Sequence, residues 1–286
     1  MDKIFTIFTP TYNRKDKLLR LYNKLLSFEF KDFVWLIIDD GSTDNTKDII
    51  ATFKDIDVEY VYVKNGGKQR AYNLAIKMAK SKYFICLDSD DYYENDALGK
   101  IKDILDNTDD KVAGAIYLSK YENGDIIGTG FNINRANHFD IYNKYGVKGD
   151  KGICFKLDVL KKYEFKIFDG EKFTTEAYLY NKIAKDYDMV CINEAFEIKE
   201  YLNDGLTSKY DKLLTSNPKG QALYYNEVFY HKKDIIIASR YIKFSLIAGY
   251  NLLRIISLSN AKFHTILALP LGLYMYLKYK IKKDKE

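Results

Sequence analysis

The residues with the clearest potential for chemistry are three carboxylates that follow an apolar run. Residues 83–87, Tyr-Phe-Ile-Cys-Leu, have strand character, and Asp88, Asp90 and Asp91 come directly after them. Strands are depleted in Asp, so the chain is expected to leave the sheet here. Acids this close repel one another unless a cation sits among them, and Asp-x-Asp suits a hard ion such as Mg²⁺ or Mn²⁺. The alternative is a strand end followed by a helix that an Asp caps.

Two further polar loops follow predicted strands. Thr-Pro-Thr-Tyr-Asn at residues 9–13 follows a short apolar run, and Asp-Asp-Gly-Ser-Thr-Asp at residues 39–44 follows a second one. The carboxyl ends of neighbouring parallel strands lie along one edge of a sheet, where ligands bind, so the three loops can face one ligand. Each loop alone is ordinary turn chemistry, but the three in this order form a specific pattern.

The elements that must position these loops alternate between strand and helix. Strands are predicted at residues 4–8, 33–38, 58–63 and 82–87, with helical segments around residues 18–26 and at residues 46–53 and 68–79. This alternation predicts a mostly parallel sheet with both faces covered by helices.

The texture of the sequence changes beyond residue 112. We expect a hairpin of residues 112–119 and 125–130 and an irregular binding loop at residues 132–151. Further segments are predicted as helices at residues 157–163 and 175–185 and as strands at residues 189–192 and 195–201.

The last fifty residues are apolar and basic. Residues 232–258 are predicted to form one long helix, and residues 263–277 form a second apolar stretch that lysines follow. The second stretch is shorter than the roughly 18–20 apolar residues of a spanning helix, so an interfacial element with lysines at the lipid headgroups is favoured. The alternatives are a helical hairpin packed on the domain or on a second subunit, as in a homo-oligomer, and a true membrane span.

Composition sets the protein class. With 286 residues, 47% hydrophobic and 30% charged, the chain can bury a sizeable core in one large domain or two smaller ones. The formal charge is +5, and the positive charge is concentrated near the C-terminus. This favours an anionic surface as a partner over a plain solvated tail, and no nucleic acid is expected as a partner.

The three Cys are far apart, as expected of thiols in a reducing compartment. The first apolar run is too short for a signal peptide, so a cytoplasmic location is expected.

The sequence resembles the inverting glycosyltransferases of family 2, of the bacterial surface-polysaccharide type, which have the GT-A fold. The resemblance is carried by residues 8–14 (Phe-Thr-Pro-Thr-Tyr-Asn-Arg), 37–44, 66–73 and 87–91, with a weaker match at residues 170–177 and 201–207. It implies an α/β GT-A domain with a C-terminal helical extension. The implied parts are a nucleotide-sugar-binding half at residues 1–110, an acceptor-binding half at residues 111–230 and an amphipathic helical region at residues 231–286.

The resemblance also implies roles around the nucleotide. Pro10 and Tyr12 would line the base pocket, Tyr12 by stacking. Asp40 would accept a hydrogen bond from the base, with uracil N3–H as the expected donor, and Asp39 would support the ribose or brace its loop. Lys68 and Arg70 open a predicted helix after two glycines, where cations suit a phosphate; exposed helix residues are the alternative.

The implied cofactor is Mn²⁺ or Mg²⁺. Asp90 would bind the ion that bridges the donor diphosphate, and Asp88 would contact the ribose, the ion or its bound water. A divalent ion stabilises the charge that develops on the leaving diphosphate. Asp91 would support this site or only cap a helix.

Inverting transfer needs a general base for the acceptor hydroxyl. In the family this is the Asp of a Glu-Asp pair that opens a helix. The matching segment here is Thr-Thr-Glu-Ala, so Glu176 takes the base position and Thr175 stands where the family often has an acid. Glu171 is the rival candidate, and a carboxylate favoured by the helix dipole is the other interpretation of Glu176.

The expected activity is transfer of one sugar from a nucleotide diphosphate sugar, with a UDP-linked donor expected, to a glycan or lipid-linked acceptor, by an enzyme bound to the inner face of the cell membrane. The Gln-x-x-Arg-Trp motif of processive synthases is absent. A sugar-phosphate nucleotidyltransferase is one alternative, but residues 9–14 lack the Gly that a triphosphate loop needs. A non-catalytic scaffold of a membrane polysaccharide assembly is the other, and it predicts loss of the carboxylates, which are present.

Overall fold

The computed structural model describes residues 3–200 and 210–284 and contains two compact units. The first unit consists of Met1–Glu164 and Ile183–Leu202, and the second of Phe165–Lys182 and Asn203–Glu286. The weak family match at residues 201–207 lies outside the described residues.

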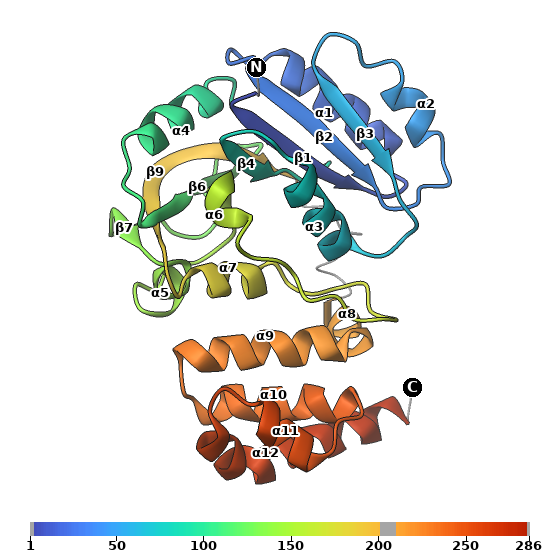
Figure 1. Ribbon diagram of the computed structural model, residues 1–286, viewed down its shortest axis with the longest axis vertical. Coiled ribbons are helices and arrows are strands. Elements are labelled where there is room, and N and C mark those ends of the chain that lie inside the picture. The colour runs from blue at the N-terminus through green and yellow to red at the C-terminus, as the bar shows by residue number, and fades with distance from the viewer. Residues whose placement is uncertain (1–2, 201–209, 285–286) are drawn as a thin grey trace. The chain divides into compact units, whose positions relative to one another are not determined.

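A mixed sheet forms the centre of the first unit (Figure 1). Within the described residues its nine strands have the order β3-β2-β1-β4-β8-β6-β9-β5, with β7 paired to β9. The strands are β1 (Phe5–Thr11), β2 (Phe33–Asp39), β3 (Val58–Tyr62), β4 (Tyr83–Cys86), β5 (Tyr92–Tyr93), β6 (Val112–Tyr121), β7 (Arg135–Ala136), β8 (Lys151–Lys156) and β9 (Asp188–Lys199).

The first four strands by sequence run parallel to one another, so their carboxyl ends meet at one edge. β1 pairs in parallel with β2 and with β4, and the register places Thr11 opposite Asp39 and Phe8 opposite Cys86. β4 therefore ends before β1 does. Pro10 lies beyond the last β4 partner, where its missing N–H breaks no bond to that strand.

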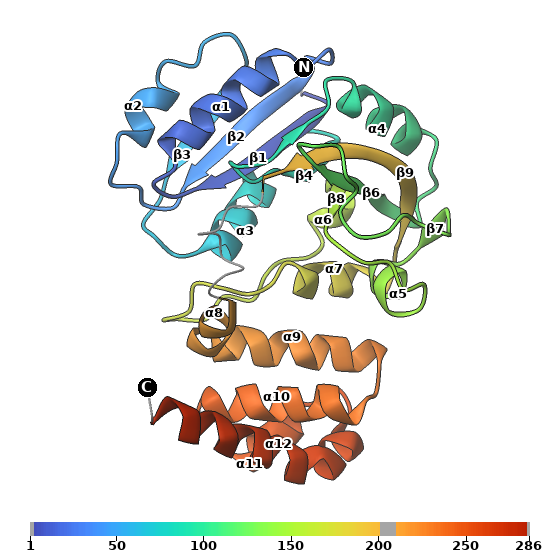
Figure 2. The same ribbon diagram turned by 180° about the vertical axis from the view of Figure 1, so that it is seen from behind.

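Helices cover both faces of this sheet. α1 and α4 pack their apolar stripes on one face, beside α2, and α3 covers the other face of β1 and β2 (Figures 1 and 2). Trp35 is fully buried between the sheet and α1, and its Nε1 donates to Thr9 Oγ1 at 2.9 Å. The helices are α1 (Lys15–Leu26), α2 (Thr46–Ile50), α3 (Lys68–Met78), α4 (Ala97–Asp106), α5 (His138–Asn143) and α6 (Leu157–Leu160).

The second unit is helical. α10 packs against both α9 and α12, and a Cβ added at Gly272 of α12 would lie 2.7 Å from Ile242 Cβ of α10, so Gly272 allows the two helices to approach closely. Among the described residues no helix has the length and apolar character to cross a bilayer. The helices are α7 (Ala177–Ile183, mostly in this unit), α8 (Tyr210–Ser216), α9 (Pro218–His231), α10 (Ile235–Ile247), α11 (Leu252–Leu258) and α12 (Lys262–Lys283).

The structure confirms the predicted α/β class, with a parallel N-terminal half of the sheet, flanking helices and a helical C-terminal region. The prediction of one helix over residues 232–258 is wrong. Gly249 has a φ of +81°, a left-handed conformation that ends a helix, and the Asn251 side chain then caps α11 by accepting from Arg254 N.

Three smaller predictions also need correction. Residues 125–130 form no strand, because only an isolated bridge joins Lys120 to Ile126 after the turn. The two strands predicted at residues 189–192 and 195–201 are one strand, β9, whose register against β6 shifts in its middle. The loop at residues 132–151 is less irregular than expected, since β7 and α5 form within it.

Candidate active site

The loops after β1 and β2 are joined by Asn13. Its side-chain Oδ1 accepts from Thr43 N at 2.8 Å and from Asp44 N at 3.3 Å, and its own N–H donates to Ser42 Oγ at 2.8 Å. Asn13 has a φ of +53°, and Asn tolerates this left-handed conformation better than most residues. The two loops therefore form one connected surface at the strand ends.

Asp39 braces its own loop. It is 1% exposed, and its carboxylate accepts from Ser42 N at 2.7 Å and from the Tyr60 hydroxyl at 2.9 Å. Burial and the hydrogen bond to Asp39 raise the pKa of Tyr60 well above its ordinary value, so Tyr60 stays a donor. These two contacts hold the loop after β2 to the Asp39 side chain.

Asp40 connects the end of β2 to the start of α3. Its two carboxylate oxygens accept from the backbone N–H groups of Gly66 and Gly67, at 2.7 and 2.9 Å. A carboxylate oxygen has more than one acceptor position, so this contact is compatible with a further bond to a base. The Arg70 side chain lies over Gly66, because a Cβ built there would be 2.5 Å from Arg70 Cδ.

Two of the three acids after β4 form ion pairs with basic side chains of the neighbouring loops. Lys68 Nζ lies 2.7 Å from Asp88 Oδ1, and Arg14 Nη1 lies 2.5 Å from Asp90 Oδ2. Arg20 also donates to the backbone oxygen of Asp90. Residues from the ends of β1 and β4 and from α1 and α3 thus gather around Asp88 and Asp90, as the parallel sheet predicts.

These cations decide the ionisation of Asp88. Desolvation among the surrounding protein atoms would raise the pKa of Asp88, but the charges of Lys68, Lys199 and Arg14 outweigh it, and the pKa lies below its ordinary value. Asp88 is therefore a carboxylate at neutral pH, as a metal ligand must be.

The third acid belongs to a buried cluster. Asp91 Oδ2 lies 3.1 Å from Lys199 Nζ on β9, Lys199 lies 3.4 Å from Glu197, and Glu197 accepts from Ser119 Oγ at 2.7 Å. Burial and the nearby acids raise the pKa of Asp91 to about 7, against the lowering effect of Lys199. Burial would lower the pKa of Lys199, but the charges of Glu197, Asp91 and Asp88 outweigh it and hold this pKa well above its ordinary value. Asp91 therefore joins β4 to β9 rather than serving only as a cap.

The donor set of Asp88 and Asp90 fits a hard divalent ion. Mg²⁺ is commonly bound by one or two carboxylates together with substrate phosphates and water. Across residues 3–200 and 210–284, no three His, Cys, Asp or Glu side chains are grouped so that they could hold a metal ion by themselves. Protein ligands and diphosphate together would complete such a site.

The two candidate bases, Glu171 and Glu176, lie in the second unit and have different surroundings. The carboxylate of Glu171 accepts from the backbone N–H groups of Lys219 and Gly220, both at 2.8 Å, and so caps the start of α9. Glu171 is 7% exposed. Glu176 is partly exposed just before α7, and the Tyr180 hydroxyl donates to its Oε2 at 3.4 Å.

The structure adds residues to which sequence reasoning assigned no role. Arg14 is part of the matched loop, and only the fold shows its contact with Asp90. Lys199 had one detectable signal, because Glu197 and Lys199 are charged, lie two residues apart in a strand and so share one face. Of the predicted base-pocket residues, Tyr12 is 49% exposed and Pro10 is partly exposed at the same edge.

Comparison with known proteins gives a consistent result. The model of the family described as glycosyl transferase family 2 matches residues 6–163. An uncharacterized glycosyltransferase of Rickettsia conorii is 39% identical over 98 residues, which are 34% of this chain and 16% of that protein. The poly(ribitol-phosphate) β-N-acetylglucosaminyltransferase TarP of Staphylococcus aureus is 27% identical over 255 residues, covering 79% of this chain and 74% of TarP. The match to the Rickettsia protein thus spans much less than two thirds of that protein's length.

Solved structures show the same fold. S. aureus TarS 1–349 in complex with UDP-GlcNAc aligns with a TM-score of 0.63 and 17% identity, over 96% of this chain and 89% of that one. The mannosyltransferase PcManGT from Pyrobaculum calidifontis, in complex with GDP-Man and Mn²⁺, aligns with a TM-score of 0.58 and 16% identity, over 98% and 83% of the two chains. These likenesses confirm the predicted GT-A fold.

Proposed function

Because the chain belongs to glycosyl transferase family 2, we propose that it transfers one sugar, with inversion, from a UDP-linked donor to a hydroxyl of a glycan or lipid-linked acceptor. We place this reaction in the synthesis of a bacterial surface polysaccharide. The names of the relatives support both choices: TarP acts on poly(ribitol-phosphate), and WfaP of Escherichia coli is a UDP-Glc-dependent glucosyltransferase that acts on a diphosphoundecaprenol-linked sugar.

The observation that carries the proposal is the pairing of aspartates with Arg and Lys side chains at the strand ends. Arg14 and Lys68 hold the Asp90 and Asp88 carboxylates at 2.5 and 2.7 Å. Their cations also add positive charge where the donor diphosphate would lie, beside the N-terminus of α3. Arg70, at the same helix start, belongs to this phosphate-facing group.

Asp88 and Asp90 would hold the Mn²⁺ or Mg²⁺. When bound, the ion would stabilise the negative charge that develops on the leaving diphosphate. The work of the protein would be to orient both carboxylates, with which Lys68 and Arg14 form ion pairs.

The loops after β1 and β2 would bind the nucleoside. The exposed ring of Tyr12, next to Pro10, offers a stacking surface for the base. Asp40 would accept from uracil N3–H, while Asp39 keeps the loop rigid through Ser42 and Tyr60.

Glu176 is the proposed general base. Glu171 already uses both carboxylate oxygens to cap α9, so moving it to a substrate would leave two backbone N–H groups without their partner. The division into a donor half (residues 1–110), an acceptor half (residues 111–230) and a C-terminal region (residues 231–286) stays part of this proposal.

The test is a screen of nucleotide sugars by thermal shift with Mn²⁺, followed by measurement of UDP release from those that bind. A ligand that binds only the folded state raises the apparent melting temperature. We expect a UDP-sugar to raise it and to be slowly hydrolysed. If no nucleotide sugar shifts the transition and none is cleaved, the proposed function is wrong.

A further inference from the structure

The outer face of α12 is apolar along nearly its whole length. The exposed fractions are 68% for Phe263, 54% for Leu267, 60% for Tyr274, 55% for Leu277 and 58% for Ile281. Exposed apolar residues that occur singly need no explanation, but a continuous row of them marks an interaction surface.

The helical positions show that this row is one face. Each residue turns the helix by about 100°, and we measure the angle around the helix axis from Phe263. The exposed apolar residues of α12 all lie between about −60° and +40° on this scale. The buried residues Thr265, Ala268 and Gly272 fall between about 140° and 200°, where Gly272 meets α10. The apolar face therefore points away from the helices on which α12 packs. We name it the α12 outer face: Phe263, Ile266, Leu267, Pro270, Tyr274, Leu277 and Ile281.

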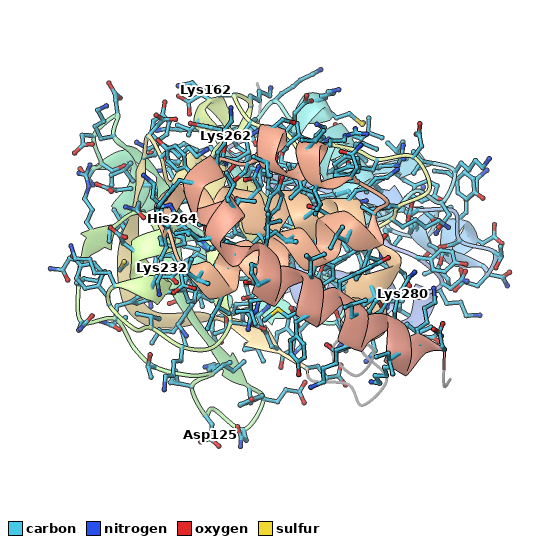
Figure 3. The ribbon with its side chains drawn as sticks, turned by 90° about the horizontal axis from the view of Figure 1, so that it is seen from below. Asp125, Lys162, Lys232, Lys262, His264 and Lys280 are labelled. Atoms are coloured by element: carbon cyan, nitrogen blue, oxygen red, sulfur yellow. The ribbon has the colours of Figure 1, made fainter. Side chains whose placement is uncertain are left out.

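Lysines border this face on both sides. Lys278 and Lys282 fall at about 60° and 100°, and Lys262 and Lys280 at about −100°. All four are exposed, and Figure 3 shows Lys262 and Lys280 toward opposite ends of α12. Long lysine side chains can keep the charge in a polar layer while their stems lie along apolar surroundings.

Acids are absent from the surrounding sequence. Residues 235–283 contain no Asp or Glu and eight Arg or Lys. This one-sided charge complements an anionic partner. A second copy of the chain would bring like charges together around the same apolar row, which opposes pairing through this face.

We propose that the α12 outer face docks flat on an anionic lipid bilayer. The apolar row would enter the boundary between headgroups and acyl chains, and the flanking lysines would contact lipid phosphates. With 22 residues, α12 is about 33 Å long, so the contact is extended. The docking rests on the proposed function in one respect, because it would keep the transferase at the surface where a lipid-linked acceptor lies.

The experiment is flotation of the full chain with vesicles of phosphatidylcholine containing about 30% phosphatidylglycerol, and with phosphatidylcholine vesicles alone. We expect binding to the anionic vesicles that is at least about tenfold stronger at low salt than to the neutral ones. Equal binding to both vesicles, or to neither, would overturn the proposal.

Two matched variants test the face itself. Leu267→Gln/Leu277→Gln removes two exposed apolar side chains from the row and should weaken binding at least about tenfold. Leu19→Gln/Ile126→Gln removes two apolar side chains of 41% and 42% exposure elsewhere and should bind as the wild type does. Equal loss in both variants, or in neither, contradicts the assignment to α12.

Two further readouts separate the alternatives. Sedimentation analysis without vesicles should show the wild type and the Leu267→Gln/Leu277→Gln variant in the same oligomeric state. A wild-type dimer that this variant dissociates would assign the face to a second copy instead. Hydrolysis of a UDP-sugar in solution should be unchanged in this variant. A wild type that binds vesicles but cleaves no nucleotide sugar refutes the proposed function alone, and one that cleaves but does not float refutes the docking alone.

Discussion

In a folded protein, charged side chains are usually exposed and apolar ones buried. The strand-end site of the first unit and the α12 outer face of the second depart from this rule in opposite ways. Near the strand ends, the acids Asp91 and Glu197 are buried beside the partly buried Lys199, whereas on α12, Phe263 and Leu277 are apolar and exposed. Buried charges are normally rare, and continuous exposed apolar surfaces are too. Each departure supports a different proposal: binding of a charged diphosphate at the strand ends and docking on a lipid surface at α12.

The two regions also differ in how their side chains are held. At the strand ends, carboxylates are fixed by ion pairs and backbone N–H groups, which preorganises the site. On α12 the outer side chains are largely exposed to solvent. Substitutions should therefore act on catalysis and stability in the first region, and on partitioning alone in the second.

The largest effect is expected from Asp90→Asn. Loss of one of two carboxylates should lower Mn²⁺-dependent UDP release by about a thousandfold, because several kcal/mol of charge stabilisation would disappear. The measurement is a coupled assay for UDP. Asp103→Asn is the control, since Asp103 is 79% exposed on α4 and should leave the rate unchanged. Wild-type rates in both variants would remove Asp90 from the metal site.

Lys199→Met should destabilise the first unit by about 3 kcal/mol, because it leaves Asp91 and Glu197 as unpaired acids in a buried place. The free energy of unfolding from urea titration measures this. The double variant Lys199→Met/Glu197→Gln removes one of the two acids and should recover part of the loss. If the single variant is as stable as the wild type, the buried cluster does not join the chain after β4 to β9 as described.

Glu176→Gln should slow transfer to an acceptor at least about a hundredfold while binding of UDP stays unchanged, because a general base contributes to the reaction and not to donor affinity. Rates are measured as sugar transfer, and donor affinity by calorimetry. Glu171→Ala is the informative counterpart. It should reduce stability by about 1–2 kcal/mol through loss of the α9 cap, so a purely kinetic effect there would reverse the two roles.

The smallest effect concerns pH. Hydrogen bonds from Lys102, Lys82 and Tyr83 lower the pKa of Asp106 below its ordinary value. A lowered folded-state pKa adds stability that is present above the unfolded-state pKa, about 3.9, and is lost as the pH falls toward the folded-state value. Between pH 5 and 2 the wild type should therefore lose up to about 1 kcal/mol more than Asp106→Asn. Parallel urea curves measure it, and an identical pH dependence would refute the pairing.

The gathering of acids at the strand ends was predictable because its signals are local. Each acidic loop follows directly on an apolar run, and parallel strands bring such loops to one edge, so Asp40, Asp88 and Asp90 are placed near one another by topology alone. The ion pairs were not predictable. Lys199 lies 108 residues from Asp91, and only the pairing of β5 with β9 brings them together.

The C-terminal region shows a different limit. Gly249 and Asn251 carry the ordinary signals of a helix end and a helix start, but the surrounding apolar run masks them. The apolar row of α12 follows from spacing, yet spacing does not tell which face packs inward. The close approach at Gly272 decides that, and it depends on α10.

The most direct measurement of the central claim is the affinity for UDP in calorimetric titrations, with Mn²⁺ and with a chelator. If Asp88 and Asp90 form a metal site at the strand ends, UDP should bind wild-type protein at least about tenfold more tightly with Mn²⁺, and Asp90→Asn should abolish the difference. Equal UDP affinity with Mn²⁺ and with the chelator would contradict the account.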